Sequence, residues 1–188
     1  MLLVTRVSGH NKWTQIKRKK AVTDAKKGRL FSKLSKIIEL AARHGSDPKT
    51  NLSLKAVLEQ ARSENMPVAN IERAVKKGSG ILEGGSVLEE VVYETYGSGG
   101  AAILILGVTD NKNRTVSEIK HILSKHGVSL SGAGSVKWLF ESKTDNGEIK
   151  WLPKQTIKLS EADDRRLSDL LSDLDDQDNV TEVYTNAE

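Results

Sequence analysis

The amino-acid sequence predicts an α+β protein, in which an N-terminal all-helical basic domain is followed by a ferredoxin-like βαββαβ domain with an added edge strand. The first observation is hydrophobic periodicity, which is helical up to residue 80 and strand-like after the glycine-rich stretch 78–85. The second is charge: residues 1–80 hold 18 Lys and Arg against 6 Asp and Glu, whereas residues 81–188 hold 11 against 19. We therefore expect domains at 1–80 and 86–188, joined by a linker at 81–85.

The first domain is expected to contain three amphipathic helices after a shorter helix at 8–20. In residues 24–44 the apolar side chains lie three and four positions apart, and Gly45 ends the pattern. At 100° per residue, the basic side chains fall on a stripe opposite the apolar face. One face would then pack and the other would be free to bind. The stripe consists of Lys26, Arg29, Lys33, Lys36 and Arg43.

A proline separates the next two helices. The helix over 54–66 has to end before Pro67, because proline disfavours helical geometry in the preceding residue. Pro67 itself suits the first turn of the following helix. We expect that helix to end at Gly78, with the glycine in the left-handed conformation of a helix cap.

The second domain shows strand-like runs separated by turn signals. Their order from residue 101 onward is β-α-β-β-α-β, and the strand before it would lie at the edge of the sheet. In chain order we expect strands at 91–96 and 101–108, a helix with a capping box of Thr115 and Glu118, a strand at 135–140, a turn at Asn146-Gly147, a strand at 156–159, a helix capped by Ser160 and a strand at 180–184.

The densest functional signal is the string from Gly9 to Lys20, which ends in the cationic run at 17–20. A charge run is usually a solvated helix face, but these like charges repel one another, and a phosphate partner would remove that cost. The pattern also continues into the helix at 24–44, so we favour a surface that binds nucleic acid. The candidate nucleic-acid-binding residues are Lys12, Lys17, Arg18, Lys19, Lys20, Lys26, Lys27, Arg29, Lys33, Lys36, Arg73, Lys76 and Lys77.

No catalytic or metal-binding constellation stands out. The chain has no cysteine, which excludes a thiol nucleophile and every cysteine-based metal site. His121 and His126 are five residues apart, off the spacing that brings two histidines to one metal on a helix. We expect no enzymatic activity, no cofactor, no metal and no small-molecule substrate. No apolar run approaches the roughly 20 residues that span a membrane, so we expect a cytoplasmic protein without a membrane partner.

With these residues in view, the chain resembles the YebC/PmpR-type family of probable transcriptional regulatory proteins, which includes the mitochondrial translational activator of cytochrome c oxidase subunit I. The resemblance covers nearly the whole chain, and one departure is large. Family members usually carry a third domain inserted between the equivalents of Phe140 and Leu152, where this chain has a short hairpin at 141–151. The motifs that carry the resemblance are Gly9-His10-Asn11-Lys12-Trp13, Asp24-Ala25-Lys26, Phe31-Ser32-Lys33-Leu34, Asn65-Met66-Pro67, Tyr93-Glu94, Thr109-Asp110-Asn111 and Val183-Tyr184-Thr185-Asn186-Ala187.

The resemblance implies a nucleic-acid-binding regulator of gene expression, and two targets stay open. The family's usual name implies a transcriptional regulator that binds DNA. The alternative is a ribosome-associated translation factor that places the same lysines on ribosomal RNA. A third hypothesis, from another class, is a protein-interaction module whose acidic second domain binds a basic protein.

Overall fold

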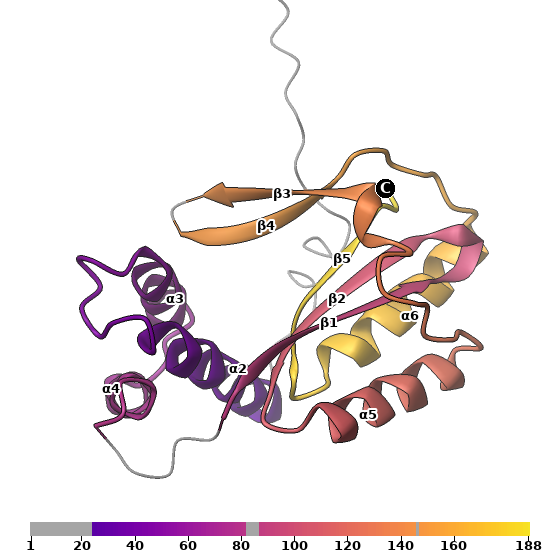
Figure 1. Ribbon diagram of the computed structural model, residues 1–188. Coiled ribbons are helices and arrows are strands. Elements are labelled where there is room, and N and C mark those ends of the chain that lie inside the picture. The colour runs from indigo at the N-terminus through magenta and orange to yellow at the C-terminus, as the bar shows by residue number, and fades with distance from the viewer. Residues whose placement is uncertain (1–23, 82–86, 146) are drawn as a thin grey trace, which may run out of the picture.

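The computed structural model describes residues 24–81, 87–145 and 147–188 (Figure 1). An N-terminal helical region precedes a sheet region, so the predicted α+β class is confirmed. The helix expected at 8–20 lies outside the described residues. The elements are α2 (Asp24–Ala42), α3 (Leu52–Ser63), α4 (Val68–Gly78), β1 (Glu89–Tyr96), β2 (Ala102–Thr109), α5 (Lys112–Lys125), β3 (Phe140–Asp145), β4 (Glu148–Pro153), α6 (Glu161–Asp175) and β5 (Val180–Thr185), with short 3-10 turns η1 (Ser98–Gly100) and η2 (Lys137–Leu139).

The helical region is a three-helix unit built on the predicted apolar faces. α2 packs against both α3 and α4, and their buried side chains form one core that includes Leu34, Ile38 and Leu54. Gly78 does not cap α4 in the left-handed conformation, as the sequence predicted. It is the last residue of the helix, and the positive φ occurs two residues later, at Gly80 (φ 74°).

The sheet region has three layers (Figure 1). The central sheet is antiparallel with the strand order β1-β2-β5, and β2 is buried along nearly its whole length. Because side chains alternate along a strand, Ile103 and Ile105 pack against α5 and α6 on one face. Ala102 and Leu104 pack against residues of the β3–β4 hairpin and the segment before it on the other.

The strand arrangement differs from the predicted ferredoxin-like sheet. β1 is an integral partner of β2 over eight residue pairs, and β3 and β4 form a separate two-stranded sheet. The physical reason is that β2 has two edges, which β1 and β5 already occupy. Residues 135–139 form a turn instead of a strand, and the strand expected at 156–159 is a single bridge between Ile157 and Ala187.

Two helix starts were predicted from capping motifs, with different outcomes. The Ser160 cap of α6 is confirmed, since its hydroxyl accepts a hydrogen bond from the Asp163 amide at 3.2 Å. The capping box of Thr115 and Glu118 was wrong. α5 begins one turn earlier, where the Asn111 side chain accepts from the Arg114 amide at 3.0 Å, and the buried Thr115 hydroxyl pairs with Thr109 instead.

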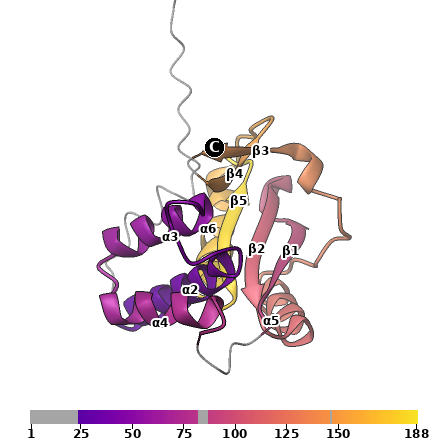
Figure 2. The ribbon, with the colours of Figure 1, turned by 60° about the vertical axis from the view of Figure 1, so that its left-hand side comes forward.

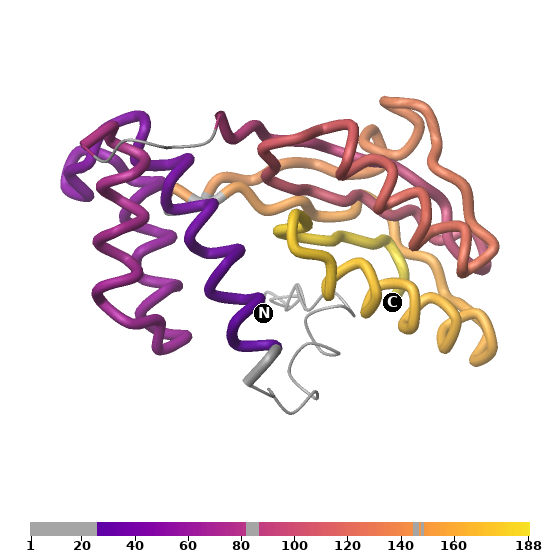
Figure 3. Tube along the Cα trace, turned by 90° about the horizontal axis from the view of Figure 1, so that it is seen from below, coloured from indigo at the N-terminus to yellow at the C-terminus, as the bar shows by residue number. Residues whose placement is uncertain are grey.

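The helical region lies against one end of the sheet region, as Figures 2 and 3 show from two further directions. At the tip of the β3–β4 hairpin, the Ser53 hydroxyl at the start of α3 donates to the Gly147 carbonyl at 3.2 Å. Beyond the end of α2, the Arg43 guanidinium donates to the carbonyl of Leu88, just before β1, at 2.7 Å. The two regions are therefore joined by polar contacts at several separate points.

Gly78 should be indispensable for the packing of α4 on α2. A Cβ at this position would overlap the Glu39 backbone oxygen and lie 2.8 Å from the Ala42 Cβ. We expect Gly78→Ala to lower the free energy of unfolding by about 1–3 kcal/mol, as overpacked sites do. Chemical denaturation of the full chain measures this.

Gly28→Ala is the matched control, because Gly28 is also helical but has no atom within 4 Å of the place that a Cβ would take. Alanine is favoured over glycine in a helix by about 1 kcal/mol, so this variant should be neutral or more stable. Equal loss of stability in both variants would contradict the close approach of the two helices.

Candidate nucleic-acid interface and the α2–α6 contact

Much of the predicted basic stripe on α2 faces the sheet region instead of solvent. Lys33 is only 7% exposed, its ammonium donates to the backbone carbonyl of Asp175, and it lies 3.9 Å from the Asp175 carboxylate. The expectation that this whole stripe is free to bind was therefore wrong. The helical period identifies which side chains lie opposite the bundle core, but it does not reveal that a second structural unit packs there.

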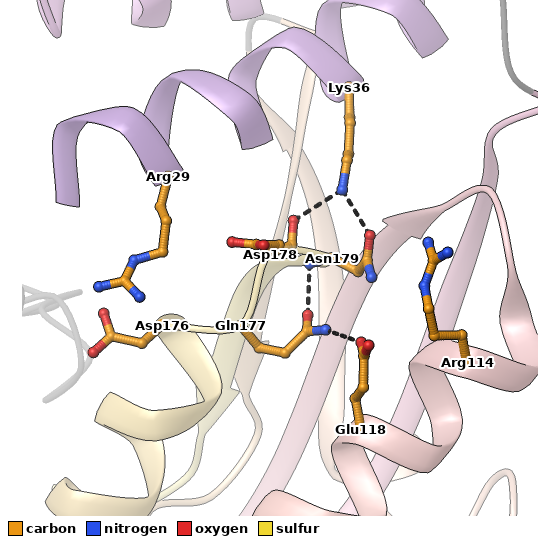
Figure 4. Close-up of a pocket in the computed structure, with 8 residues that line it drawn as sticks. All are labelled: Arg29, Lys36, Arg114, Glu118, Asp176, Gln177, Asp178 and Asn179. Carbon is orange, nitrogen blue, oxygen red and sulfur yellow. Dashed lines mark hydrogen bonds between the residues drawn. The ribbon is translucent and has the colours of Figure 1, made fainter. Parts of the chain in front are cut away.

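Lys36 makes a similar contact one turn further along α2. Its ammonium donates to the Asp178 carbonyl at 3.1 Å and to the Asn179 side-chain oxygen at 2.6 Å (Figure 4). Burial lowers the pKa of Lys36, and nearby carboxylates such as Asp178 offset only part of that effect. Lys36 is thus a structural cation held by the segment between α6 and β5.

We name the contacts of Lys26, Lys33 and Lys36 with residues 175–179 the α2–α6 clasp. Lys26 contributes an ion pair with Asp176 at 3.9 Å. The last carbonyls of a helix carry partial negative charge, and acidic side chains there are unfavourable. α6 ends at Asp175 with no basic residue in its last turn. The α2 lysines therefore neutralise a helix end that would otherwise repel its own side chains.

An open pocket of about 410 Å³ lies beside the clasp, where α2 meets α5 and the α6–β5 segment (Figure 4). Arg29 points toward Asp176 in it, and the Arg29 Nε is buried without a hydrogen-bond partner among the described residues. Its lining contains three cationic side chains and three carboxylates, so it favours no strongly charged ligand of either sign. The lining residues are Arg29, Lys36, Arg114, Glu118, Asp176, Gln177, Asp178 and Asn179.

The remaining candidates divide by exposure. Lys27 on α2 and Arg73 and Lys76 on α4 are exposed, whereas Lys77 is half-buried and lies 3.7 Å from the Glu39 carboxylate. Lys12, Lys17, Arg18, Lys19 and Lys20 lie outside the described residues. Among the candidate residues that the structure describes, the exposed cations are therefore Lys27, Arg73 and Lys76.

Sequence reasoning missed two exposed cations on α3. Lys55 and Arg62 are both exposed. They are seven residues apart, which places them on the same face of a helix after two turns. That spacing is visible in the sequence and is the signal that could have added them to the candidate set.

Metal-binding clusters and membrane-spanning helices are absent from the part of the chain that the structure describes. Within 24–81, 87–145 and 147–188, no group of three or more His, Cys, Asp or Glu side chains is placed to hold a metal ion. In the same ranges, no helix has the length and apolar character needed to cross a membrane.

Comparison with known proteins identifies the family. Residues 11–81 match the TACO1/YebC protein N-terminal domain, and residues 88–145 and 141–187 match the TACO1/YebC second and third domain. The chain belongs to the TACO1/YebC family. A "Probable transcriptional regulatory protein" of Dictyoglomus turgidum is 48% identical over 187 residues, covering 97% of this chain and 72% of that protein.

Other family members show where this chain is shorter. A "Probable transcriptional regulatory protein" of Thermosipho africanus is 40% identical over 238 aligned positions, covering 97% of this chain and 94% of that protein. Since the chain has 188 residues, at least 50 of those 238 positions have no counterpart in it. The two matched segments of the second family model meet at 141–145, in β3. This supports the predicted replacement of an inserted domain by the hairpin, which the structure forms as β3–β4.

The fold is shared with a solved structure. The crystal structure of a conserved hypothetical protein, Aq1575, from Aquifex aeolicus superposes with a TM-score of 0.81 at 34% identity, covering 94% of this chain and 96% of that one. The helical region and the sheet region of this TACO1/YebC chain therefore have the same overall arrangement as that crystal structure.

The clasp predicts a stability difference between two lysines on the same helix. Lys33→Met should lower the free energy of unfolding by about 1–3 kcal/mol, because the Asp175 acceptors lose a buried donor. The exposed Lys27→Met should stay within about 0.5 kcal/mol of the parent. Urea denaturation of the full chain compares them, and equal stability of the two variants would remove Lys33 from the structural contact.

Proposed function

We propose that this TACO1/YebC chain is a nucleic-acid-binding regulator of gene expression, acts on DNA as a transcriptional regulatory protein, and is not an enzyme. The observation that carries the proposal is the excess of positively charged side chains in the helical region that take no part in the clasp. Residues 1–80 have a formal charge of +12, and Lys27, Arg73 and Lys76 remain exposed. The printed names of the relatives, probable transcriptional regulatory proteins, support the same function.

The proposed mode of binding is neutralisation of backbone phosphates. Lysine is a point charge on a flexible stem, suited to phosphate, whereas base edges are usually contacted by Arg, Asn and Gln from one helix. Lysine predominates among the candidate residues. We therefore propose weak sequence specificity, at the low end of the roughly 10³–10⁷ range for dedicated regulators.

In the proposed function, residues 1–80 contact the phosphates of a duplex, and residues 86–188 form a separate acidic domain. The family matches support this boundary, since one ends at residue 81 and the other begins at residue 88. A cytoplasmic location, where nucleic acid is accessible, goes with the proposal. It requires neither a cofactor nor a small-molecule substrate.

Single alanine substitutions test the proposed surface. Lys27→Ala, Arg73→Ala and Lys76→Ala should each weaken binding to a DNA duplex, and each should lower the slope of log affinity against log salt by about 1. Fluorescence anisotropy over a salt series measures both. Lys120→Ala on α5 removes the same charge from an exposed position of the sheet region and should leave the slope unchanged. Three unchanged slopes at the α2 and α4 positions would contradict the proposed surface.

Crosslinking in cells tests the choice of nucleic acid. A photoreactive group at Lys27, or at the N-terminal Lys19, should recover DNA if the chain acts on transcription. Sequencing of the attached nucleic acid identifies the target. Recovery of ribosomal RNA near a functional centre, with no enrichment of DNA, would overturn the transcriptional assignment.

A further inference from the structure

Two exposed aromatic side chains of the sheet region are anchored to one backbone carbonyl. The Trp138 indole nitrogen donates to the Ser135 carbonyl at 3.0 Å, and the Tyr96 hydroxyl donates to the same oxygen at 2.8 Å. Trp138 is nevertheless 63% exposed and Tyr96 41% exposed. Their polar atoms are bonded within the chain, so each side chain is held in place while much of its aromatic surface meets solvent.

A buried carboxylate fixes the loop that carries this arrangement. Glu94, on β1, is 4% exposed and accepts hydrogen bonds from the amides of Gly134, Val136 and Lys137 at 2.6–2.7 Å. Burial raises the pKa of Glu94, but these three bonds outweigh burial and leave its pKa below the ordinary value. The loop before Trp138 is thus tied to the central sheet by an ionised side chain.

Apolar anchors flank the exposed tryptophan. Val136 and Phe140 are two residues before and two residues after Trp138. Val136 is fully buried and Phe140 is 3% exposed, and both pack against Ala102 and Leu104 of β2. Because the residues two positions before and after Trp138 are buried, Trp138 is exposed on a fixed turn and not on a frayed segment.

Two lysines lie next to Trp138, one of them its neighbour in the sequence. The Lys154 ammonium donates to the Trp138 carbonyl at 2.7 Å, and the Lys137 ammonium lies 5.0 Å from the centre of the Trp151 ring. Residues 131–160 hold five lysines against three acids, a net +2 inside a half of the chain whose total is −8. The segment that carries Trp138 is therefore basic within an otherwise acidic sheet region.

Trp138 lies at the end of the hairpin opposite its tip. Phe140 pairs with Pro153 at the base, and Asp145 pairs with Glu148 at the tip. Five residue steps at roughly 3.3 Å each separate these ends by about 16 Å. Trp138, two residues before the base, therefore lies away from the tip, where Gly147 accepts a hydrogen bond from Ser53 of α3.

We propose that Trp138 and Tyr96, with Lys137 and Lys154, form a second nucleic-acid contact, which stacks an unpaired base and neutralises the adjoining phosphates. Every base has a π face that an aromatic ring can stack on, and single-strand binding sites combine such rings with a cationic track. The inference rests on the proposed nucleic-acid function and adds to it a preference for single-stranded segments.

A protein partner is the competing occupant of an exposed tryptophan, since tryptophan is common at protein interfaces. Interface cores are depleted in lysine, whereas here one lysine ammonium bonds the Trp138 backbone carbonyl and another belongs to the adjacent residue, Lys137. Charge complementarity therefore favours an anionic polymer.

Binding by the full chain to single strands and duplexes tests the inference. The probes are a fluorescein-labelled 12-nucleotide oligothymidylate, the matching oligouridylate and a 20-base-pair DNA duplex, measured by anisotropy. Trp138→Ala should weaken single-strand binding by about 5- to 150-fold, the range that corresponds to the loss of one stacked base. Duplex affinity should change less than twofold. Trp138→Phe should recover most of the single-strand affinity, because it restores a ring face.

Matched controls separate this inference from the proposed function. Ile149→Ala removes another exposed apolar side chain, 56% exposed on β4 near the hairpin tip, and should have no effect on binding to any of the three probes. Unchanged single-strand affinity in a folded Trp138→Ala variant, alongside duplex binding that still depends on Lys27, would overturn the second contact and leave the proposed function standing. Absence of binding to every probe by the parent chain would overturn both.

Discussion

The fold depends on the burial of β2 on both faces and both edges. Its edges pair with β1 and β5, Ile103 and Ile105 pack under α5 and α6, and Ala102 and Leu104 pack under the β3–β4 layer. A strand that is buried on both faces has a continuous apolar sequence, and residues 101–106 are all apolar. Because both edges of β2 are paired, the hairpin contacts β2 only through its face, where it packs as a separate layer.

The division of charge along the chain is partly resolved within the molecule. The cationic face of α2 meets the carbonyl end and acidic side chains of α6 at Lys26, Lys33 and Lys36. Such contacts fix the relative position of the two regions more than they add stability, since buried ion pairs lose much of their attraction to desolvation. Positively charged side chains that take no part in the clasp remain for a partner, among them Lys27, Arg73 and Lys76.

Local structure followed closely from local sequence. The apolar period placed α2, α3 and α4, and Ser160 marked the start of α6. The predicted start of α5 was wrong because two possible helix caps lie close together in the sequence. Thr115 and Glu118 have capping-box spacing, but Asn111 caps first because it follows β2 directly, and Thr115 is used inside the core with Thr109. Residues 156–159 form only a single bridge where a strand was expected, because a β-like sequence pattern does not supply a partner strand.

The sequence by itself determined the helices of the basic region, the order of a basic helical region before an acidic sheet region, and the family, because these depend on residues close together along the chain. The tertiary structure alone decided which cations are exposed. Lys27 and Lys33 are six residues apart on one helix, and only the packing of α6 buries the second. It also brought Tyr96 and Trp138 to the carbonyl of Ser135. Contacts between residues about 40 to 140 positions apart have no signature in a local pattern, so they become visible only once the chain is folded.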